Sequence, residues 1–222
     1  MLSGDDREFI SALAESVASM GTRPLTDSAL QRMGLHYNLL SKWNARLNLT
    51  RIVAPQEAAR LHYAESIYGY DLIKGTASML DVGSGAGFPA VPMAIMDGGL
   101  NVTALESNQK KSIFLKEVKQ QLALVNLMVE TSRIEEFECR GYAVIASRAL
   151  DRAEKMYGDL LRRLSPGQIL MLFCSDGMIE TLSRELPPGI KIDRHAIPDS
   201  QSRVIAFFKT LPALNTLPAH NG

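Results

Sequence analysis

The chain has 222 residues, of which 46% are hydrophobic and 22% are charged, a composition typical of a soluble globular protein. Its 24 basic residues balance 24 acidic ones. The chain therefore lacks the overall positive charge of many nucleic-acid binders, although a local basic patch would suffice for binding. No apolar run approaches the roughly 20 residues of a membrane span, and residues 1–7 show no export signal. We expect a cytoplasmic protein with no membrane partner.

The cysteines and histidines argue against a metal site. Cys139 and Cys174 have no partner at the spacing of metal ligands, and the four histidines are scattered along the chain. We therefore expect no metal cofactor.

The segment 1–68 predicts a small N-terminal helical cap. Apolar side chains recur every four positions over residues 9–17 and every three or four positions over residues 30–47, a spacing typical of amphipathic helices. After a break at residues 48–55, a third helix is expected over about residues 56–68.

Over residues 69–210 the pattern changes to strands that alternate with helices. Such alternation forces crossover connections and a mostly parallel sheet covered on both faces. The expected strands are Ser78–Val82, Asn101–Glu106, Leu127–Glu130, Tyr142–Ala146 and Ile169–Phe173. The expected helices are Phe88–Met96, Asn108–Leu122, Arg152–Leu164 and Met178–Leu186. Two later strands, Ile190–His195 and Arg203–Lys209, predict an antiparallel hairpin at the end of the sheet, and residues 211–222 predict a frayed tail.

The glycine-rich segment Asp81–Gly87 follows the first expected strand and predicts a cofactor loop. Gly83 and Gly85 permit positive φ and let backbone N–H groups approach a ligand closely. The third glycine comes one residue earlier than in a dinucleotide fingerprint, and Asp81 would repel a pyrophosphate. A carboxylate there can instead meet the positive methionine end of S-adenosylmethionine. The segment favours an S-adenosylmethionine site over the alternatives, another nucleotide or a purely structural turn.

Two acidic segments follow the next strands. Glu106 ends the second strand, where a carboxylate would accept both ribose hydroxyls of an adenosine cofactor. The alternative is a surface glutamate beside a helix that Asn108 could cap. Ile134 and Glu135 follow the third strand, where such folds place backbone groups against an adenine edge. Glu135 could also simply open a short helix.

Basic residues offer candidates for phosphate or RNA contact. Arg148 ends an apolar strand at the edge where ligands bind in open α/β sheets. We expect it to contact cofactor or phosphate, with a structural ion pair as the alternative, because an unpaired buried charge is costly. Basic helix residues could meet an RNA backbone, although charge runs are more often solvated helix faces; these residues are Lys110, Lys111, Lys116, Lys119, Arg162 and Arg163.

Several segments between residues 37 and 150 together resemble one family, the bacterial methyltransferases that modify guanine N7 in small-subunit ribosomal RNA, also called glucose-inhibited division protein B. The resemblance is colinear along the chain. The matching segments are Trp43-Asn44, Leu47–Thr50, Arg60–Ser66 (family pattern R-x-H-x-x-D-S, with Glu65 for aspartate), Asp81–Pro92, Ser132–Glu136 and Ser147–Ala149.

The resemblance implies a Rossmann-like S-adenosylmethionine-dependent methyltransferase fold acting on small-subunit ribosomal RNA or the small ribosomal subunit. It implies cofactor contacts at Gly83, Phe88, Ile134, Glu135 and Arg148, with Glu106 at the ribose. Guanine N7 carries a lone pair and no proton, so transfer needs alignment and no general base. We therefore assign no catalytic acid or base, although Arg148 could polarise guanine O6.

The chain departs from the family pattern at two positions. Ala90 stands where glycine is usual, and Asp176 lies where the fifth strand usually ends in Lys-Gly, so that an acid replaces a base. Two other functions stay open on the sequence alone: a small-molecule methyltransferase of the same fold, and a cofactor- or ribosome-binding protein without transfer activity. The sequence does not fix the oligomeric state, and a monomer is the favoured expectation.

Overall fold

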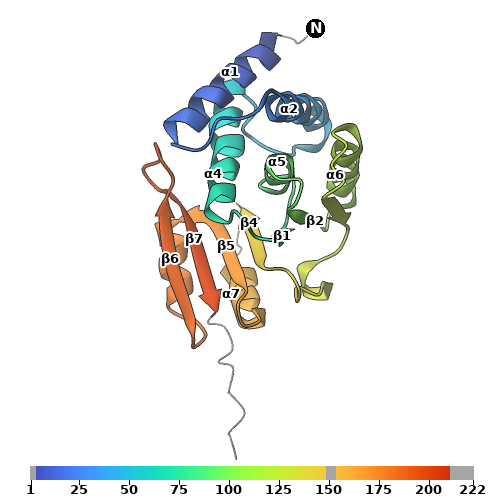
Figure 1. The fold of residues 1–222 in the computed structure, drawn as a ribbon. Coiled ribbons are helices and arrows are strands. Elements are labelled where there is room, and N and C mark those ends of the chain that lie inside the picture. The colour runs from blue at the N-terminus through green and yellow to red at the C-terminus, as the bar shows by residue number, and fades with distance from the viewer. Residues whose placement is uncertain (1–3, 149–153, 211–222) are drawn as a thin grey trace, which may run out of the picture.

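The computed structural model describes residues 4–148 and 154–210, and its fold is a sheet covered by helices on both faces (Figure 1). The expected frayed tail at residues 211–222 and the start of the helix expected at Arg152 lie outside the described residues. Two clusters of buried apolar side chains form the core, one on each face of the sheet.

The N-terminal segment is helical, as expected. Its elements are α1 (Gly4–Ser19), α2 (Asp27–Leu47), α3 (Pro55–Ala58), the π-helix η1 (Ala59–Ala64) and α4 (Glu65–Leu72). The third expected helix is thus longer than residues 56–68, and it contains a π-helical turn of a kind that is frequent at functional sites.

The sheet has seven strands in the order β3-β2-β1-β4-β5-β7-β6. The four pairings among β1 to β5 are parallel, and β7 pairs antiparallel with both β5 and β6. This confirms the predicted mostly parallel sheet with a C-terminal antiparallel hairpin. The strands are β1 (Ser78–Val82), β2 (Asn101–Leu105), β3 (Leu127–Glu130), β4 (Val144–Arg148), β5 (Ile169–Ser175), β6 (Ile190–Ala196) and β7 (Arg203–Thr210).

Strand β4 begins two residues later than predicted. The Gln168 side chain donates to the Tyr142 carbonyl (2.7 Å), and the Tyr142 hydroxyl donates to Thr103 (3.1 Å). Tyr142 is therefore fixed by hydrogen bonds from side chains and not by backbone pairing with a neighbouring strand. The shift puts Arg148 at the last position of β4, at the carboxyl edge of the sheet.

Helices between the strands cover both faces of the sheet. They are α5 (Ala90–Met96), α6 (Gln109–Gln121), the short 3-10 helix η2 (Ile134–Glu136), α7 (Glu154–Arg163) and α8 (Asp176–Ser183). Helix α5 begins at Ala90 and not at Phe88, and Gly87, three residues before it, has a positive φ of 92°. Helices α5 and α6 pack with the N-terminal helices on one face, whereas α7 and α8 pack on the other.

The N-terminal helices and one face of the sheet share a continuous core. The same cluster contains Phe9 of α1, Tyr63 of η1 and Met79 of β1, all fully buried. The expected boundary at residue 68 falls inside α4, and the division into a cap and a sheet domain stays a prediction.

Within residues 4–148 and 154–210, none of the helices combines the length and apolar character needed to cross a bilayer. Across the same residues, no group of three or more histidine, cysteine or acidic side chains is placed to hold a metal ion.

Candidate functional site

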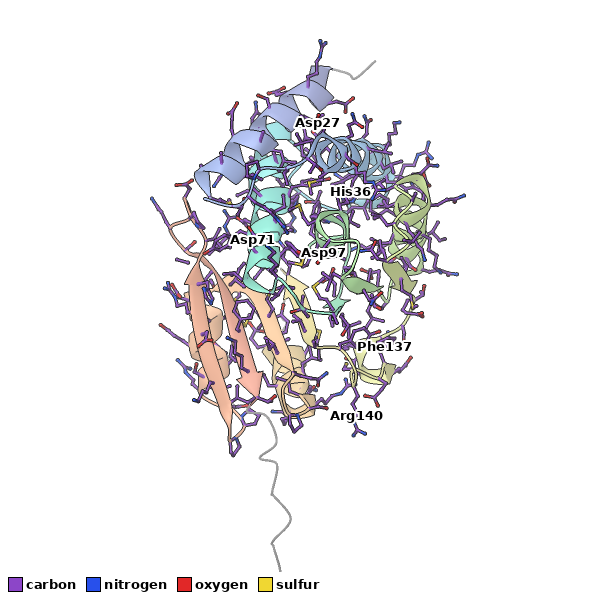
Figure 2. The ribbon with its side chains drawn as sticks, in the orientation of Figure 1. Asp27, His36, Asp71, Asp97, Phe137 and Arg140 are labelled. Atoms are coloured by element: carbon purple, nitrogen blue, oxygen red, sulfur yellow. The ribbon has the colours of Figure 1, made fainter. Side chains whose placement is uncertain are left out.

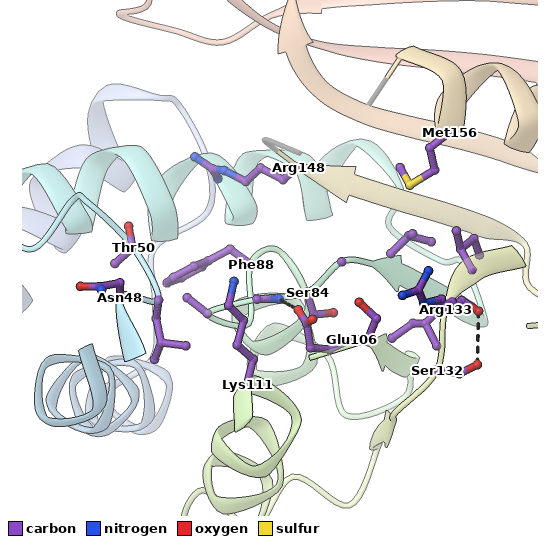
Figure 3. Close-up of a pocket in the computed structure, with 18 of the residues that line it drawn as sticks. Asn48, Thr50, Ser84, Phe88, Glu106, Lys111, Ser132, Arg133, Arg148 and Met156 are labelled. Carbon is purple, nitrogen blue, oxygen red and sulfur yellow. Dashed lines mark hydrogen bonds between the residues drawn. The ribbon is translucent and has the colours of Figure 1, made fainter. Parts of the chain in front are cut away.

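A pocket of about 1180 Å³ lies at the carboxyl ends of the parallel strands (Figure 3). Because these ends meet at one edge of the sheet, the loops after β1, β2 and β3 converge there with Arg148 at the end of β4. The pocket is lined by seven of the eight residues predicted to bind a cofactor, namely Gly83, Gly85, Phe88, Glu106, Ile134, Glu135 and Arg148. The structure therefore brings together residues that lie up to 65 positions apart in the sequence, from Gly83 to Arg148.

The glycine loop forms the floor of this pocket. The amides of Gly83 and Ser84 donate to a β2 carbonyl (2.9 and 3.1 Å), which fixes the loop on the sheet. Gly83 and Gly85 have φ values of 73° and 53°. A Cβ added at Gly85 would meet only a backbone oxygen at 3.7 Å, so the space above it is open to a ligand. Gly87 differs, because a Cβ there would come within 2.7 Å of an α5 side chain.

Asp81 lies behind the loop and not in the pocket. Its side chain is fully buried, accepts from the Ser84 hydroxyl (2.7 Å) and accepts from the Ala90 amide (3.3 Å). Burial raises the pKa of this carboxyl to about 7. Asp81 therefore supports the loop and the start of α5, and its expected contact with a cofactor stays a prediction.

Glu106 is a buried carboxylate at the pocket, not a surface residue. One oxygen accepts from the Gly85 amide (2.9 Å) and the other from the Asn108 amide (2.7 Å). Asn108 itself caps α6 by accepting from the amides of Lys110 and Lys111. Glu106 thus ties the glycine loop to β2 while one side of its carboxylate faces the cavity.

Arg148 combines the two roles that the sequence left open. It lines the pocket, and its guanidinium pairs with the buried Glu65 carboxylate at 2.9 Å. It also donates to the carbonyls of Leu61 and His62, which the π-helix η1 presents to it. The other Glu65 oxygen lies 2.7 Å from the Arg203 guanidinium. Burial raises the pKa of Glu65, and the facing arginines oppose that shift.

A histidine and a phenylalanine form one wall of the pocket. The rings of His62 and Phe88 stack with centroids 4.5 Å apart and an interplanar angle of 17°. His62 also shares a hydrogen bond of 2.9 Å with the Thr50 hydroxyl. Burial, with a smaller effect from Arg148, lowers the pKa of His62 to about 3. The ring is therefore neutral at pH 7.

A second buried histidine supports the glycine loop from α2 (Figure 2). His36 lies 3.1 Å from the Ala86 carbonyl through Nε2 and 2.9 Å from the Tyr63 hydroxyl through Nδ1. Since the carbonyl can only accept, Nε2 carries the proton and Nδ1 accepts from Tyr63. Burial lowers the pKa of His36 to about 3. The sequence alone did not suggest this role for a scattered histidine.

Arg163 holds the segment that closes the other end of the pocket. Its guanidinium donates to the carbonyls of Ile134 (2.8 Å) and Phe137 (2.6 Å) and approaches the Cys139 sulfur (3.7 Å). Arg163 thus has an internal role although it is exposed, and its expected RNA contact stays a prediction. Neighbouring Arg162 pairs with an aspartate of the same helix at 2.6 Å.

The basic residues expected at an RNA backbone do not form one surface. Lys110 and Lys111 lie on α6, whereas Arg162 and Arg163 lie on α7, and these helices cover opposite faces of the sheet. Lys111 lines the pocket, and its side chain extends toward Phe88 (Figure 3).

The two departures from the family pattern lie outside the pocket lining. Ala90 is fully buried at the start of α5 and donates its amide to Asp81. Asp176 begins α8 on the surface and makes a bidentate pair with Arg194 at 2.5 and 2.8 Å.

Sequence reasoning on chemistry missed the turn that follows α2. This turn adds Asn48, Leu49, Thr50, Arg51 and Ile52 to the lining. The signal was present, because Leu47–Thr50 and the segment with His62 are among the stretches that resemble the family. Other lining residues that were not predicted as site residues are Val82, Ser84, Ala86, Leu105, Ser107, Ser132, Arg133 and Met156.

Comparison with known proteins gives a match over most of the chain. Residues 29–183 match the family model described as GidB: rRNA small subunit methyltransferase G. Ribosomal RNA small subunit methyltransferase G of Stenotrophomonas maltophilia is 37% identical over 81% of this chain and 83% of that protein. The protein of the same name from Solibacter usitatus is 30% identical over 80% of this chain and 88% of that protein.

Solved structures confirm the fold class. An O-methyltransferase from Bacillus cereus in complex with SAH aligns with a TM-score of 0.56 and 16% identity, over 79% of this chain and 91% of that chain. A SAM-dependent O-methyltransferase from Thermotoga maritima aligns with a TM-score of 0.53 and 15% identity, over 77% and 71% of the two chains. At these identities the likeness shows a shared Rossmann-like fold.

Proposed function

The chain belongs to the GidB family of small-subunit ribosomal RNA methyltransferases, and we propose that it transfers the methyl group of S-adenosylmethionine to N7 of a guanosine in small-subunit ribosomal RNA. The observation that carries this proposal is the convergence of the open glycine loop, Glu106 and the Ile134–Glu135 segment on one large pocket. The test is transfer of labelled methyl groups to small subunits that lack N7-methylguanosine, followed by nucleoside analysis.

The residues present fit S-adenosylmethionine. The open space above Gly85 admits the cofactor backbone, and its positive φ keeps a side chain out of that space. Each Glu106 oxygen accepts one amide hydrogen, so lone pairs remain for ribose hydroxyls. Ile134 offers an apolar contact for the adenine ring, and Glu135 lies beside it. When bound, the cofactor supplies an electrophilic methyl group on a positively charged sulfur.

The reaction needs alignment more than proton transfer. Guanine N7 attacks with a lone pair, so the protein must hold N7, the methyl carbon and the sulfur in line. The neutral His62 ring and the Phe88 ring are stacked and form a wall of the pocket against which the reactants can be aligned. The Glu65 carboxylate pairs with Arg148 and so offsets positive charge beside the place where the guanine gains positive charge.

The rim of the pocket supports RNA as the substrate over a small acceptor. Arg51, Lys111 and Arg133 line the mouth, and within residues 4–148 and 154–210 none of the three forms an ion pair. Free cations around a cavity suit the phosphates of a nucleic acid. Neither Asp176 nor Ala90 lines this cavity, which supports an active enzyme.

Location and assembly complete the proposal. A protein that modifies the small subunit acts in the cytoplasm of a bacterium. We therefore keep a cytoplasmic monomer as part of the proposed function.

A further inference from the structure

The cofactor contacts proposed above occupy one end of the pocket. Glu106, Ser132 and Arg133 lie on one side of Phe88, and the turn after α2 lies on the other (Figure 3). The cavity of about 1180 Å³ exceeds the roughly 300–1,000 Å³ of pockets that hold one drug-sized ligand. The end beyond Phe88 therefore has room for a second ligand.

The turn at this end, residues 48–52, is fixed by hydrogen bonds on the side that faces the protein interior. The Asn44 side chain donates to the Thr50 carbonyl (3.0 Å) and accepts from the Thr50 amide (2.9 Å). The Thr50 hydroxyl accepts from the Ile52 amide (3.1 Å) and is hydrogen-bonded to His62. A turn fixed by its own polar groups presents its outward side chains in a defined geometry.

Asn48 provides the outward amide of this turn. Its backbone is left-handed, with φ 48° and ψ 52°, a conformation that asparagine adopts more readily than most residues. Its side chain is exposed and lines the pocket, and within the described chain no hydrogen bond satisfies it. The amide therefore offers an adjacent donor and acceptor to a ligand.

The chemistry of the acceptor base fits such an amide. A guanine that reacts at N7 must turn its N7 edge toward the methyl group. The Watson–Crick edge then stays free for hydrogen bonds to the protein. This edge places the O6 acceptor next to the N1–H donor. The Asn48 amide group can donate to O6 while its carbonyl accepts from N1–H, whereas an arginine can only donate.

We propose that residues 48–52, with the stacked rings of His62 and Phe88, form the subsite for the acceptor guanine, and that Asn48 reads its O6 and N1 positions. This inference rests on the proposed function and assigns the substrate base a place in that site. The ring pair, with centroids 4.5 Å apart, gives a flat wall on which a base can stack. Exposed Arg51 lies within the same turn, where it can reach the phosphate of the same nucleotide.

The variant Asn48→Gly removes the amide and keeps the left-handed backbone, because glycine adopts positive φ without strain. We expect kcat/KM for methyl transfer to small subunits to fall about 10- to 100-fold, as for one lost bidentate base contact. The cofactor Kd, measured by calorimetry, stays within about twofold of the wild-type value. The matched control is Ala123→Gly, which replaces another residue with positive φ (49°) outside the pocket lining and leaves both values unchanged.

The phosphate contact has its own test in the same assay. Arg51→Ala should lower the slope of log affinity for small subunits against log salt by about 0.7–0.9. Arg7→Ala, an exposed arginine on α1, should leave that slope unchanged.

Each contrary result has a distinct meaning. If Asn48→Gly transfers methyl groups at the wild-type rate, the guanine subsite lies elsewhere while the proposed function stands. If the cofactor Kd rises in parallel with the loss of transfer, the turn belongs to the cofactor site and the inference is wrong. If the wild-type protein binds cofactor and makes no N7-methylguanosine, the proposed function itself fails, and the subsite with it.

Discussion

The carboxylate of Glu65 and the guanidinium of Arg148 are joined 2.9 Å apart across the boundary between the N-terminal helices and the sheet. Glu65 is 1% exposed and also pairs with Arg203 of β7 at 2.7 Å. One buried carboxylate thus pairs with two arginines and links α4, β4 and β7 at the edge of the pocket.

Replacement of this carboxylate should destabilise the fold. Glu65→Gln leaves two arginines side by side without a counter-charge, and we expect the free energy of unfolding to fall by about 3–5 kcal/mol. Arg203→Ala should cost less, because its side chain is 33% exposed and Arg148 keeps its partner. Urea denaturation of the three proteins measures the difference. A loss below about 1 kcal/mol for Glu65→Gln would contradict the structural role assigned to this carboxylate.

The space above the glycine loop should be sensitive to an added side chain. Gly85→Asp places a charged group in the open cavity, close to the Glu106 carboxylate that contacts the Gly85 amide. We expect cofactor affinity to fall at least about tenfold, because both volume and like charge oppose binding. The matched control is Gly141→Asp, where φ is also positive (93°) and no atom lies within 4 Å of an added Cβ. Equal calorimetric affinities for the two variants would place the cofactor elsewhere.

Arg163 should affect cofactor binding without touching the cofactor. Arg163→Ala removes the two hydrogen bonds that hold the carbonyls of Ile134 and Phe137. We expect the cofactor Kd to rise about tenfold, as for the loss of roughly 1.4 kcal/mol of positioning. Arg162→Ala removes an equal charge from the same helix and should leave the Kd unchanged. Equal Kd values for the Arg163→Ala and Arg162→Ala variants would overturn this assignment.

His36 should make the fold sensitive to acid. Its pKa is about 3 in the folded protein and about 6.5 in an unfolded chain. Between these two pH values His36 is protonated in the unfolded chain and neutral in the folded protein. The free energy of unfolding therefore falls as the pH falls from 6.5 toward 3. The loss from this group approaches about 1.4 kcal/mol per pH unit.

The variant His36→Gln measures this contribution. Glutamine keeps a donor for the Ala86 carbonyl and cannot titrate, so the variant lacks the acid-dependent loss. The stability gap between wild type and variant should narrow from pH 6 to pH 4 in urea denaturation. A gap that stays constant over this range would show that His36 is not buried in its neutral form.

The regular part of this fold could be predicted from local sequence. Apolar periodicity located the strands to within about two residues, because buried faces impose a strict spacing on each element. The glycine loop and Glu106 were predicted as site residues because parallel strands bring their carboxyl ends together. These features depend on the chain's local pattern and on general rules of sheet topology.

The rest depended on packing between distant segments. Nothing local distinguishes Arg163, which binds the segment after β3, from Arg162, which faces solvent one residue earlier. The stack of His62 on Phe88 likewise joins two segments whose proximity follows from how the N-terminal helices dock on the sheet. Asp81 was expected in the pocket, and its burial behind the loop depends on the turn that Gly83 and Gly85 impose.

The measurement that tests the central claim most directly is transfer of labelled methyl groups from S-adenosylmethionine to small ribosomal subunits that lack N7-methylguanosine, with free small-subunit RNA in parallel. We predict label in N7-methylguanosine after nucleoside analysis, and loss of that label in Gly85→Asp. A protein that binds the cofactor and yet leaves both the subunits and the free RNA unlabelled would contradict the proposed function.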